Sequence, residues 1–294
     1  MRDSSGERGM SQRILKRLVR SARYRTVNLA WKQFERAKRR AHGRRTNNTD
    51  RHLLIVGCQR SGTTHLERLF RADPRSCVFG EFSALSISPG KTAWQPLEDV
   101  VEILQSSGGG YSVARSLFSS HRTIDILDRL PGSVAVWVYR DAGSVVRSML
   151  RKWGGTFRSV SERVESLPDG AWDLHSFWDD VETFAAKHSE KPAVHKTADV
   201  YAAFWLLRNQ QFFDLGLDKD PRITLVDYET LTRNPRETLD GLWSNVGVGA
   251  PRATFPIRTR GSGQRPDTES QFSPAMQKLC DDLHQRLRRA EASH

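Results

Sequence analysis

Residues 53–66 read Leu-Leu-Ile-Val-Gly-Cys-Gln-Arg-Ser-Gly-Thr-Thr-His-Leu, and this stretch constrains the fold more than any other part of the chain. Four apolar residues followed by two spaced glycines predict a buried strand, a tight loop and the start of a helix. Such a junction directs several backbone N–H groups and the positive end of the helix dipole at one small volume. The stretch therefore predicts a phosphate-binding loop.

The residues inside this loop limit the kinds of phosphate chemistry that it can support. Gly57 and Gly62 have the spacing of the nucleoside-triphosphate P-loop, but the next residue is Thr63, where that loop has lysine. The cation of this loop is instead Arg60. A P-loop without its lysine makes a poor ATPase, although it can still hold a phosphate that is not itself transferred.

A second junction of the same kind follows later in the chain. Residues 134–139 form an apolar run with β-branched and aromatic side chains, which predicts a buried strand. Arg140 stands at its end, and Ser148 follows eight residues later in a predicted helix. Arginine offers a forked, charge-assisted contact and serine offers a hydroxyl donor, so this pair predicts a second anion site. Two separated phosphates on one nucleotide would fit the two sites.

These segments resemble the PAPS-dependent sulfotransferase family, especially its bacterial carbohydrate or lipid members and its tyrosylprotein members. Residues 59–64 look like the family's 5′-phosphosulfate loop, and Arg140 with Ser148 looks like its 3′-phosphate pair. A third motif, Tyr-Glu-x-Leu at residues 228–231, is followed by Asn234 and Pro235. The resemblance covers roughly residues 53–247.

The order of predicted strands and helices and the resemblance lead to the same fold. Alternating strands and helices favour an α/β domain of three layers, with a mostly parallel central sheet flanked by helices. The resemblance implies the P-loop-like sulfotransferase form of that fold, with PAPS as co-substrate and no metal. It implies these cofactor-binding residues: Arg60, Ser61, Gly62, Thr63, Thr64, His65, Arg140, Ser148, Tyr228, Arg258, Arg260 and Gly261. Tyr228 fits a core tyrosine at a strand end equally well.

The resemblance also implies catalytic residues. Arg60 would neutralise charge on the bridging oxygen, and Glu81, 21 residues further on, would be the general base. His121 is the alternative base, because other family members use a histidine before the second strand. The family's lysine upstream of that strand is missing here, and Arg115 or Arg122 could replace it.

The expected reaction is sulfuryl transfer by in-line displacement to an acceptor hydroxyl on a carbohydrate, a lipid or a small metabolite. The aromatic segment from Trp153 to Trp178 is the candidate wall for that acceptor. Two alternatives stay open. One is a P-loop kinase-like phosphotransferase, which predicts a loop lysine and a carboxylate for Mg²⁺ at a strand end. The other is a non-catalytic, membrane-associated nucleotide-binding protein.

The net charge of +12 is concentrated at the start of the chain. Residues 1–50 contain 15 Lys and Arg and 4 Asp and Glu, which gives +11, whereas the remaining 31 and 30 give +1. We therefore expect a basic, partly helical N-terminal arm and linker over residues 1–50 and a sulfotransferase domain over residues 51–294. Because the body is nearly neutral, nucleic acid is not a predicted partner.

The arm has the pattern of a basic amphipathic helix, with Leu18 and Trp31 among the apolar residues. Such a helix can lie on an anionic membrane surface, here through residues 1–45, or it can pack its apolar face on the body. Three cysteines without metal-ligand spacing favour a reducing compartment. No apolar run reaches the ~20 residues of a membrane span, so the expected location is cytoplasmic, with peripheral membrane contact as the extension.

Overall fold

The computed structural model describes residues 50–87, 94–154, 174–188, 196–251 and 272–293, together with residues 33, 34, 37, 38 and 40. The chain divides into two compact units, Met1–Asn47 and Asn48–His294. Most of the basic arm lies outside the described residues, so its contact with membranes stays a prediction. Within the described ranges, no helix combines the length and the apolar character that crossing a membrane requires.

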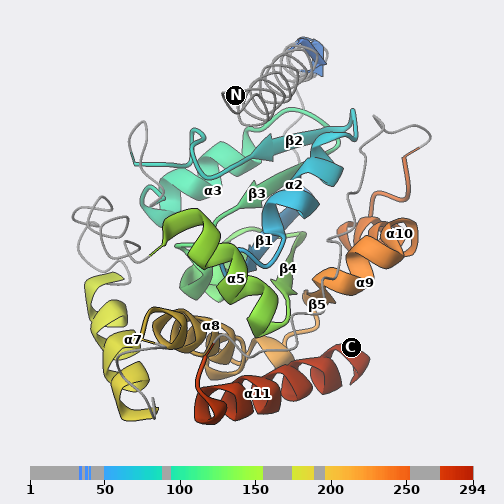
Figure 1. Cartoon of the computed structure of the whole chain (residues 1–294). Coiled ribbons are helices and arrows are strands. Elements are labelled where there is room, and N and C mark those ends of the chain that lie inside the picture. The colour runs from blue at the N-terminus through green and yellow to red at the C-terminus, as the bar shows by residue number, and fades with distance from the viewer. Residues whose placement is uncertain are drawn as a thin grey trace, which may run out of the picture. The chain divides into compact units, whose positions relative to one another are not determined.

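The second unit is built on a five-stranded sheet in which all neighbouring strands are parallel (Figure 1). The strand order is β2-β3-β1-β4-β5. The strands are β1 (His52–Gly57), β2 (Ser76–Phe79), β3 (Tyr111–Arg115), β4 (Ser133–Tyr139) and β5 (Ile223–Asp227). The prediction of an α/β fold with a mostly parallel central sheet is thus confirmed.

Helices connect and cover these strands. The α-helices are α2 (Thr63–Arg71), α3 (Leu97–Gln105), α4 (Thr123–Arg129), α5 (Ala142–Trp153), α7 (Leu174–His188), α8 (Lys196–Asp214), α9 (Tyr228–Arg233), α10 (Pro235–Val246) and α11 (Pro274–Ser293). Two short 3₁₀ turns, η1 (Ser120–Arg122) and η2 (Leu217–Lys219), precede α4 and β5. Every crossover between the parallel strands therefore contains helix, as parallel pairing requires.

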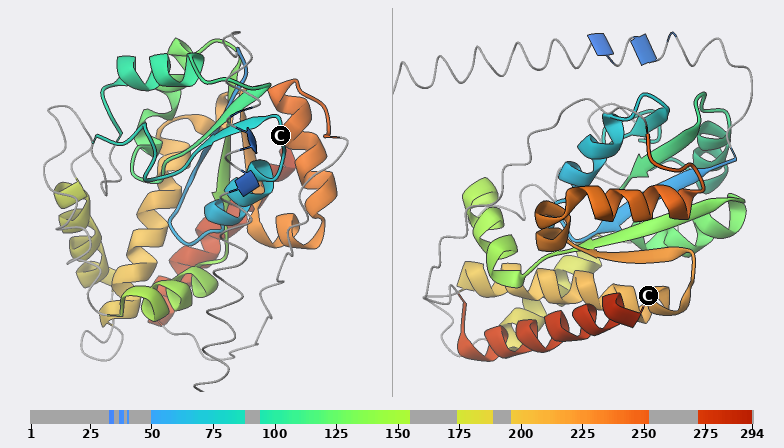
Figure 2. Two further views of the ribbon diagram at one scale, coloured as in Figure 1. Left: turned by 90° about the horizontal axis from the view of Figure 1, so that it is seen from above. Right: turned by 90° about the vertical axis from the view of Figure 1, so that its right-hand side faces the viewer.

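Both faces of the sheet are buried, which makes the domain three layers deep. In β1, Leu53 and Ile55 belong to one apolar cluster, and Leu54 and Val56 belong to the other. This alternation follows from the two-residue period of a strand. The first cluster includes residues of α2 and α10, and the second includes residues of α8 and α11, on opposite sides of the sheet in Figure 2.

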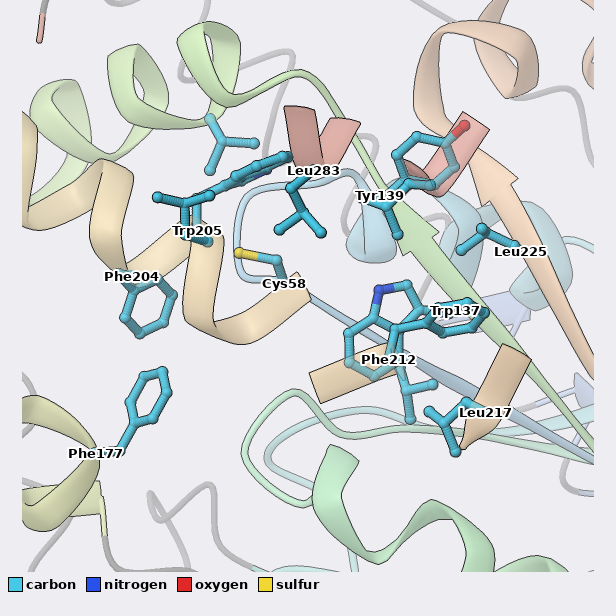
Figure 3. Close-up of a cluster of buried hydrophobic side chains, with 14 of the residues drawn as sticks. Cys58, Trp137, Tyr139, Phe177, Phe204, Trp205, Phe212, Leu217, Leu225 and Leu283 are labelled. Carbon is cyan, nitrogen blue, oxygen red and sulfur yellow. The ribbon is translucent and has the colours of Figure 1, made fainter. Parts of the chain in front are cut away.

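The larger cluster is rich in aromatic side chains, and two of them tie helix α8 to strand β4 (Figure 3). The Trp137 indole N–H donates to Asn209 Oδ1 at 3.3 Å. The Trp205 indole N–H donates to the backbone oxygen of Arg140 at 2.9 Å, directly after the end of β4. Buried indoles need such partners. The packing of this core therefore also fixes the strand end that carries Arg140.

The topology brings the predicted site residues to one edge of the sheet. Strand β1 lies between β3 and β4, where the order of connections changes direction. In open parallel sheets, ligands bind outside the carboxyl ends of the strands at such a switch point. The Gly62 loop follows β1, Arg140 follows β4 and Tyr228 follows β5.

Candidate nucleotide-binding and active site

The loop between β1 and α2 has the tight backbone that a phosphate cradle needs. Gly62 caps α2 with φ 100°, and Arg60 also adopts a left-handed backbone, with φ 69°. The Ser61 N–H donates to the Cys58 oxygen at 3.3 Å, and the His65 N–H donates to the Gly62 oxygen at 2.8 Å. The first N–H groups of a helix have no acceptor within it, so those at the start of α2 are available to an anion.

Tyr228 closes this loop from the side of β5. A Cβ atom on Gly62 would lie 2.0 Å from Cδ2 of Tyr228, so only glycine fits beside the ring. The Tyr228 ring also meets the ring of His65 edge-on, with centroids 6.0 Å apart. The Arg140 guanidinium lies over the Tyr228 ring at 4.5 Å. Tyr228 thus joins the loop after β1 to the cation after β4.

Arg140 is held in place from several directions. Its Nε donates to Glu229 Oε1 at 3.0 Å, and its backbone oxygen accepts the bond from Trp205. Burial raises the pKa of Glu229, with the charge of Arg140 opposing that shift. The next carboxylate, Asp141, accepts the Ser144 N–H at 2.7 Å as the cap of α5. The strand end therefore presents an arginine, while the adjacent aspartate has a structural role.

Ser148 contacts the loop arginine. Arg60 Nε donates to Ser148 Oγ at 3.0 Å, and the Arg60 guanidinium lies 5.8 Å from the Trp153 ring centroid. Arg140 and Ser148 are predicted to bind the same phosphate, and this stays a prediction; in the structure Arg140 donates to Glu229, and Ser148 accepts from Arg60. Both residues still lie beside the same loop, one through Tyr228 and the other through Arg60.

Positive charge gathers around Arg60. Burial and the neighbouring charge of Arg151 lower the pKa of Arg60, Glu81 opposes them, and Arg140 lowers it further. Cations that are held close together create a positive electrostatic potential, which attracts an anion. The arrangement suits a ligand with more than one negative group.

Glu81 lies just beyond β2, which returns the chain toward the loop as the sequence predicts. Its Oε1 is 3.1 Å from Arg115 Nη1, and Arg115 also pairs with Glu67 of α2. The Glu81 carboxylate therefore contacts the end of β3, and it is close enough to Arg60 to affect the pKa of that arginine. The adjacent Phe82 is 67% exposed, the highest exposure of a large apolar side chain among the described residues.

His121 has a less suitable environment for a base. It lies in the turn η1, half-buried, where burial and the charges of Arg208 and Arg122 lower its pKa to about 4. A catalytic base works best with a pKa near the operating pH, and the pKa of His121 lies well below neutral pH. Arg122 donates to the Gln95 oxygen at 3.1 Å, whereas Arg115 lies against Glu81. Of these two arginines, Arg115 is the one that pairs with the predicted base.

The remaining predicted residues fall into two groups. Ser61 and Thr63 are buried in the loop and the first turn of α2, whereas Thr64 is exposed. His65 is half-buried, and burial followed by the charge of Arg68 lowers its pKa. The predicted basic glycine loop of Arg258, Arg260 and Gly261 lies outside the described residues. So does most of the predicted aromatic wall, residues 155–173.

Two neighbours of the site were not predicted as site residues. Glu67 pairs with Arg115, and Glu229 pairs with Arg140. Trp153, the first residue of the predicted aromatic wall, lies beside Arg60. The role of Glu67 could have been found from the sequence. This acid stands next to Leu66 in the apolar stripe of a helix, and a buried acid needs a cation as its partner. Glu229 lies within the Tyr-Glu-x-Leu motif, but its partner on another strand is not visible in the sequence.

No protein-family model matches the chain, and no curated protein matches it. Solved structures do match, and several of them are sulfotransferases. The sulfotransferase domain of the Synechococcus PCC 7002 olefin synthase is 14% identical, with 84% of this chain and 94% of that chain covered and a TM-score of 0.44.

Two further structures give similar values. A sulfotransferase from Alicyclobacillus acidocaldarius is 16% identical, with coverage of 82% and 94% and a TM-score of 0.44. Mouse sulfotransferase SULT7A1, complexed with PAP, is 10% identical, with coverage of 81% and 65% and a TM-score of 0.38. At such identities the function has to be argued from the site itself.

Proposed function

We propose that this protein transfers a sulfuryl group from PAPS to an acceptor hydroxyl. The observation that carries the proposal is the cluster around Tyr228. That ring lies against Gly62 of the phosphate-type loop and under Arg140, which follows a different strand. A nucleotide with phosphates at both its 5′ and 3′ positions would use both cations of this cluster, Arg60 and Arg140.

The residues of the loop fit the 5′ side of such a nucleotide. Tyr228 leaves room only for glycine at position 62, which keeps the backbone open to a close ligand. The first turn of α2 directs N–H groups to the same place. Arg60, held by Ser148, is the cation nearest to these donors in sequence. These features support the binding of a phosphate that is not itself transferred.

In the proposed reaction, PAPS supplies the sulfuryl group and leaves as adenosine 3′,5′-bisphosphate. Glu81 accepts the proton of the acceptor hydroxyl as the general base. Arg60 neutralises the charge that grows on the bridging oxygen. Both roles require groups fixed before reaction: the ion pair with Arg115 holds Glu81, and the hydrogen bond to Ser148 holds Arg60.

The kinase alternative fits the site less well. The loop has Thr63 in the place of lysine, and β4 is followed by Arg140 and then by an aspartate that caps α5. A phosphotransferase needs a carboxylate for Mg²⁺ at that strand end. Isothermal titration calorimetry separates the two activities. We expect adenosine 3′,5′-bisphosphate to bind at micromolar level or tighter, about −8 kcal/mol, and ATP to bind more weakly. Tighter binding of ATP would favour the kinase.

A matched pair of variants tests the assignment of the 3′-phosphate. Arg140→Ala should weaken PAPS far more than adenosine 5′-phosphosulfate, which lacks the 3′-phosphate. Arg129→Ala is the control, because Arg129 also pairs with a glutamate, Glu98, but precedes the start of β4. A strand of 7 residues places it roughly 20 Å away. Equal losses for both ligands in Arg140→Ala would remove the 3′ assignment.

The acceptor has to be found in the cell that makes this protein. Phe82 exposes its ring next to the proposed base, which supports an acceptor with an apolar surface beside its hydroxyl. Lipid and polar extracts from cells with and without the gene should be compared by mass spectrometry. The expected result is a product heavier by one sulfate ester in the lipid extract, and its appearance in the polar extract would point to a soluble acceptor.

A further inference from the structure

The last turn of α11 joins the ends of two strands through one carboxylate. The Tyr139 hydroxyl donates to Glu291 Oε2 at 2.6 Å, and the Asp227 N–H donates to Glu291 Oε1 at 2.9 Å. Tyr139 is the last residue of β4, and Asp227 is the last residue of β5. These two residues are also paired across the sheet. Glu291 therefore holds both members of one cross-strand pair.

The residues that directly follow these two strands are the ones that the proposed function requires. Arg140 follows Tyr139, Tyr228 follows Asp227, and the Arg140 guanidinium lies over the Tyr228 ring at 4.5 Å. A shift of either strand end would separate the cation from the ring. The carboxylate of Glu291 is thus one residue away from both parts of the proposed 3′-phosphate site.

A second route leads from Glu291 to the same arginine. The Asp227 carboxylate caps α9 by accepting the N–H groups of Glu229 and Thr230 at 3.3 and 3.4 Å. Glu229 in turn accepts from Arg140 Nε at 3.0 Å. Fixing Asp227 therefore fixes the start of α9, which places the partner of Arg140.

The surroundings of Glu291 favour a lasting hydrogen bond with the Tyr139 hydroxyl. Burial and the adjacent Glu291 raise the pKa of Tyr139, so its hydroxyl keeps the proton that it donates. Asp227 reinforces that shift, while Arg288 on α11 opposes it. Helix α11 is anchored independently by four buried side chains, Met276, Cys280, Leu283 and Leu287. Loss of the Glu291 carboxylate should therefore leave the helix packed and change only what the carboxylate holds.

We propose that Glu291 is a positioning residue that sets the register of Arg140 and Tyr228 for recognition of a nucleotide 3′-phosphate. The inference rests on the proposed function for its ligand, and on the two bonds to Glu291 for its mechanism. It predicts that the C-terminal helix tunes nucleotide affinity without touching the nucleotide.

The test compares Glu291→Ala, Glu291→Gln and the control Asp282→Asn, which changes an exposed acid on the same helix. Calorimetry measures the affinity for adenosine 3′,5′-bisphosphate and for adenosine 5′-phosphosulfate. Glu291→Ala should weaken the first ligand about tenfold, the cost of one charge-assisted hydrogen bond, and the second less than about twofold. Glu291→Gln should recover part of the loss, because its amide oxygen can still accept the Asp227 N–H.

Amide hydrogen exchange gives a readout that needs no ligand. In Glu291→Ala, exchange should accelerate at residues 227–230 and 140–142 and stay unchanged at residues 60–66. Unchanged exchange at both strand ends, or equal loss of both ligands, would overturn the positioning role. If the unaltered protein binds no adenosine 3′,5′-bisphosphate, the proposed function fails, and the exchange pattern alone still decides whether Glu291 clamps the strand ends.

Discussion

The two halves of the site are built in different ways. The loop after β1 is one continuous segment in which the backbone supplies the donors, with Gly62 at φ 100° and Arg60 at φ 69°. The half after β4 and β5 is assembled from side chains on separate strands, where Arg140 meets Tyr228 and Glu229. The first half depends on local geometry, and the second depends on strand register and on the packing of α8 and α11.

This difference divides the roles in the proposed reaction. Glu81 is close enough to Arg60 of the loop half to affect its pKa, so the proposal places the transferred group at this half. The strand-end half has its cation paired with Glu229 and lying over Tyr228, so the proposal assigns it to the far side of the nucleotide. Substitutions in the first half should affect turnover most, and substitutions in the second should affect affinity.

The largest effect is expected at Glu81. Glu81→Gln should reduce sulfate-ester formation by about 10²–10⁴-fold, because general base catalysis contributes that much. The affinity for adenosine 3′,5′-bisphosphate should change less than about twofold, since the proposed base acts on the acceptor. The measurement is the level of sulfated product in cells that carry each variant, with calorimetry on the purified proteins.

The matched control for this prediction is His121→Gln. A comparable loss of product in His121→Gln, with full activity in Glu81→Gln, would transfer the role of base to the histidine. It would also move the chemistry from β2 to the η1 turn.

A loss of affinity of about 100-fold is expected when the loop itself is blocked. In Gly62→Ala, the added Cβ would lie 2.0 Å from Tyr228 Cδ2, and the left-handed backbone adds about 1–2 kcal/mol of strain. Tyr228 would have to leave, so both halves of the site should fail together. Calorimetry with adenosine 3′,5′-bisphosphate measures the loss.

Gly241→Ala is the control for glycine replacement. Gly241 lies in α10, and nothing lies within 4 Å of its Cβ position. Alanine there should raise stability by about 0.5–1 kcal/mol and leave binding unchanged. Binding that survives Gly62→Ala intact would show that Tyr228 is not part of the nucleotide site.

Much of the fold could be predicted because its signals are local. The run Leu53–Val56 and the glycines behind it define β1 and its loop, and residues 134–139 define β4 by the same signals. Strand β3 was not predicted, because Tyr111–Arg115 contains serine and arginine among its apolar residues and both faces of it are buried. Helix α11 was not predicted either, although its buried residues recur at helical spacing.

The site residues also divide into those with a local signal in the sequence and those without one. The loop residues Arg60 to His65 are contiguous, so a motif identifies them together. The pairing of Arg60 with Ser148 crosses 88 residues, and that of Tyr139 with Glu291 crosses 152. Such contacts depend on tertiary packing, to which sequence spacing gives no guide. This is why the bonds of Arg140 to Glu229 and of Ser148 to Arg60 could not be predicted from the sequence.

A smaller effect is expected from the bond that links Ser148 to the loop. Ser148→Ala removes the acceptor of Arg60 Nε and should weaken nucleotide binding about three- to tenfold, the value of one net hydrogen bond. Ser144→Ala, one turn earlier in α5, removes a hydroxyl that accepts from Arg147 and should leave the affinity unchanged. Equal affinities for all three proteins would show that Arg60 needs no help from α5.

The smallest expected effect concerns pH. Burial raises the pKa of Glu229, so this carboxyl takes up a proton earlier than an ordinary glutamate as the pH falls. While it is ionised it competes with a phosphate for Arg140. The neutral form of Glu229 holds that arginine less strongly. Protonation of Glu229 on acidification should therefore favour phosphate binding. Glu229→Gln imitates the neutral form at every pH.

The comparison of Glu229→Gln with the unaltered protein removes the titration of the ligand itself. At pH 7.5 the variant should bind adenosine 3′,5′-bisphosphate about threefold more tightly, and the ratio should fall toward one as the pH is lowered. Glu237→Gln, an exposed acid in α10, is the control and should show a constant ratio. If Glu229→Gln binds more weakly at every pH, the orientation of Arg140 by Glu229 outweighs the competition between Glu229 and the phosphate. The strand-end half would then be prearranged by its own carboxylates, as the loop half is by its backbone.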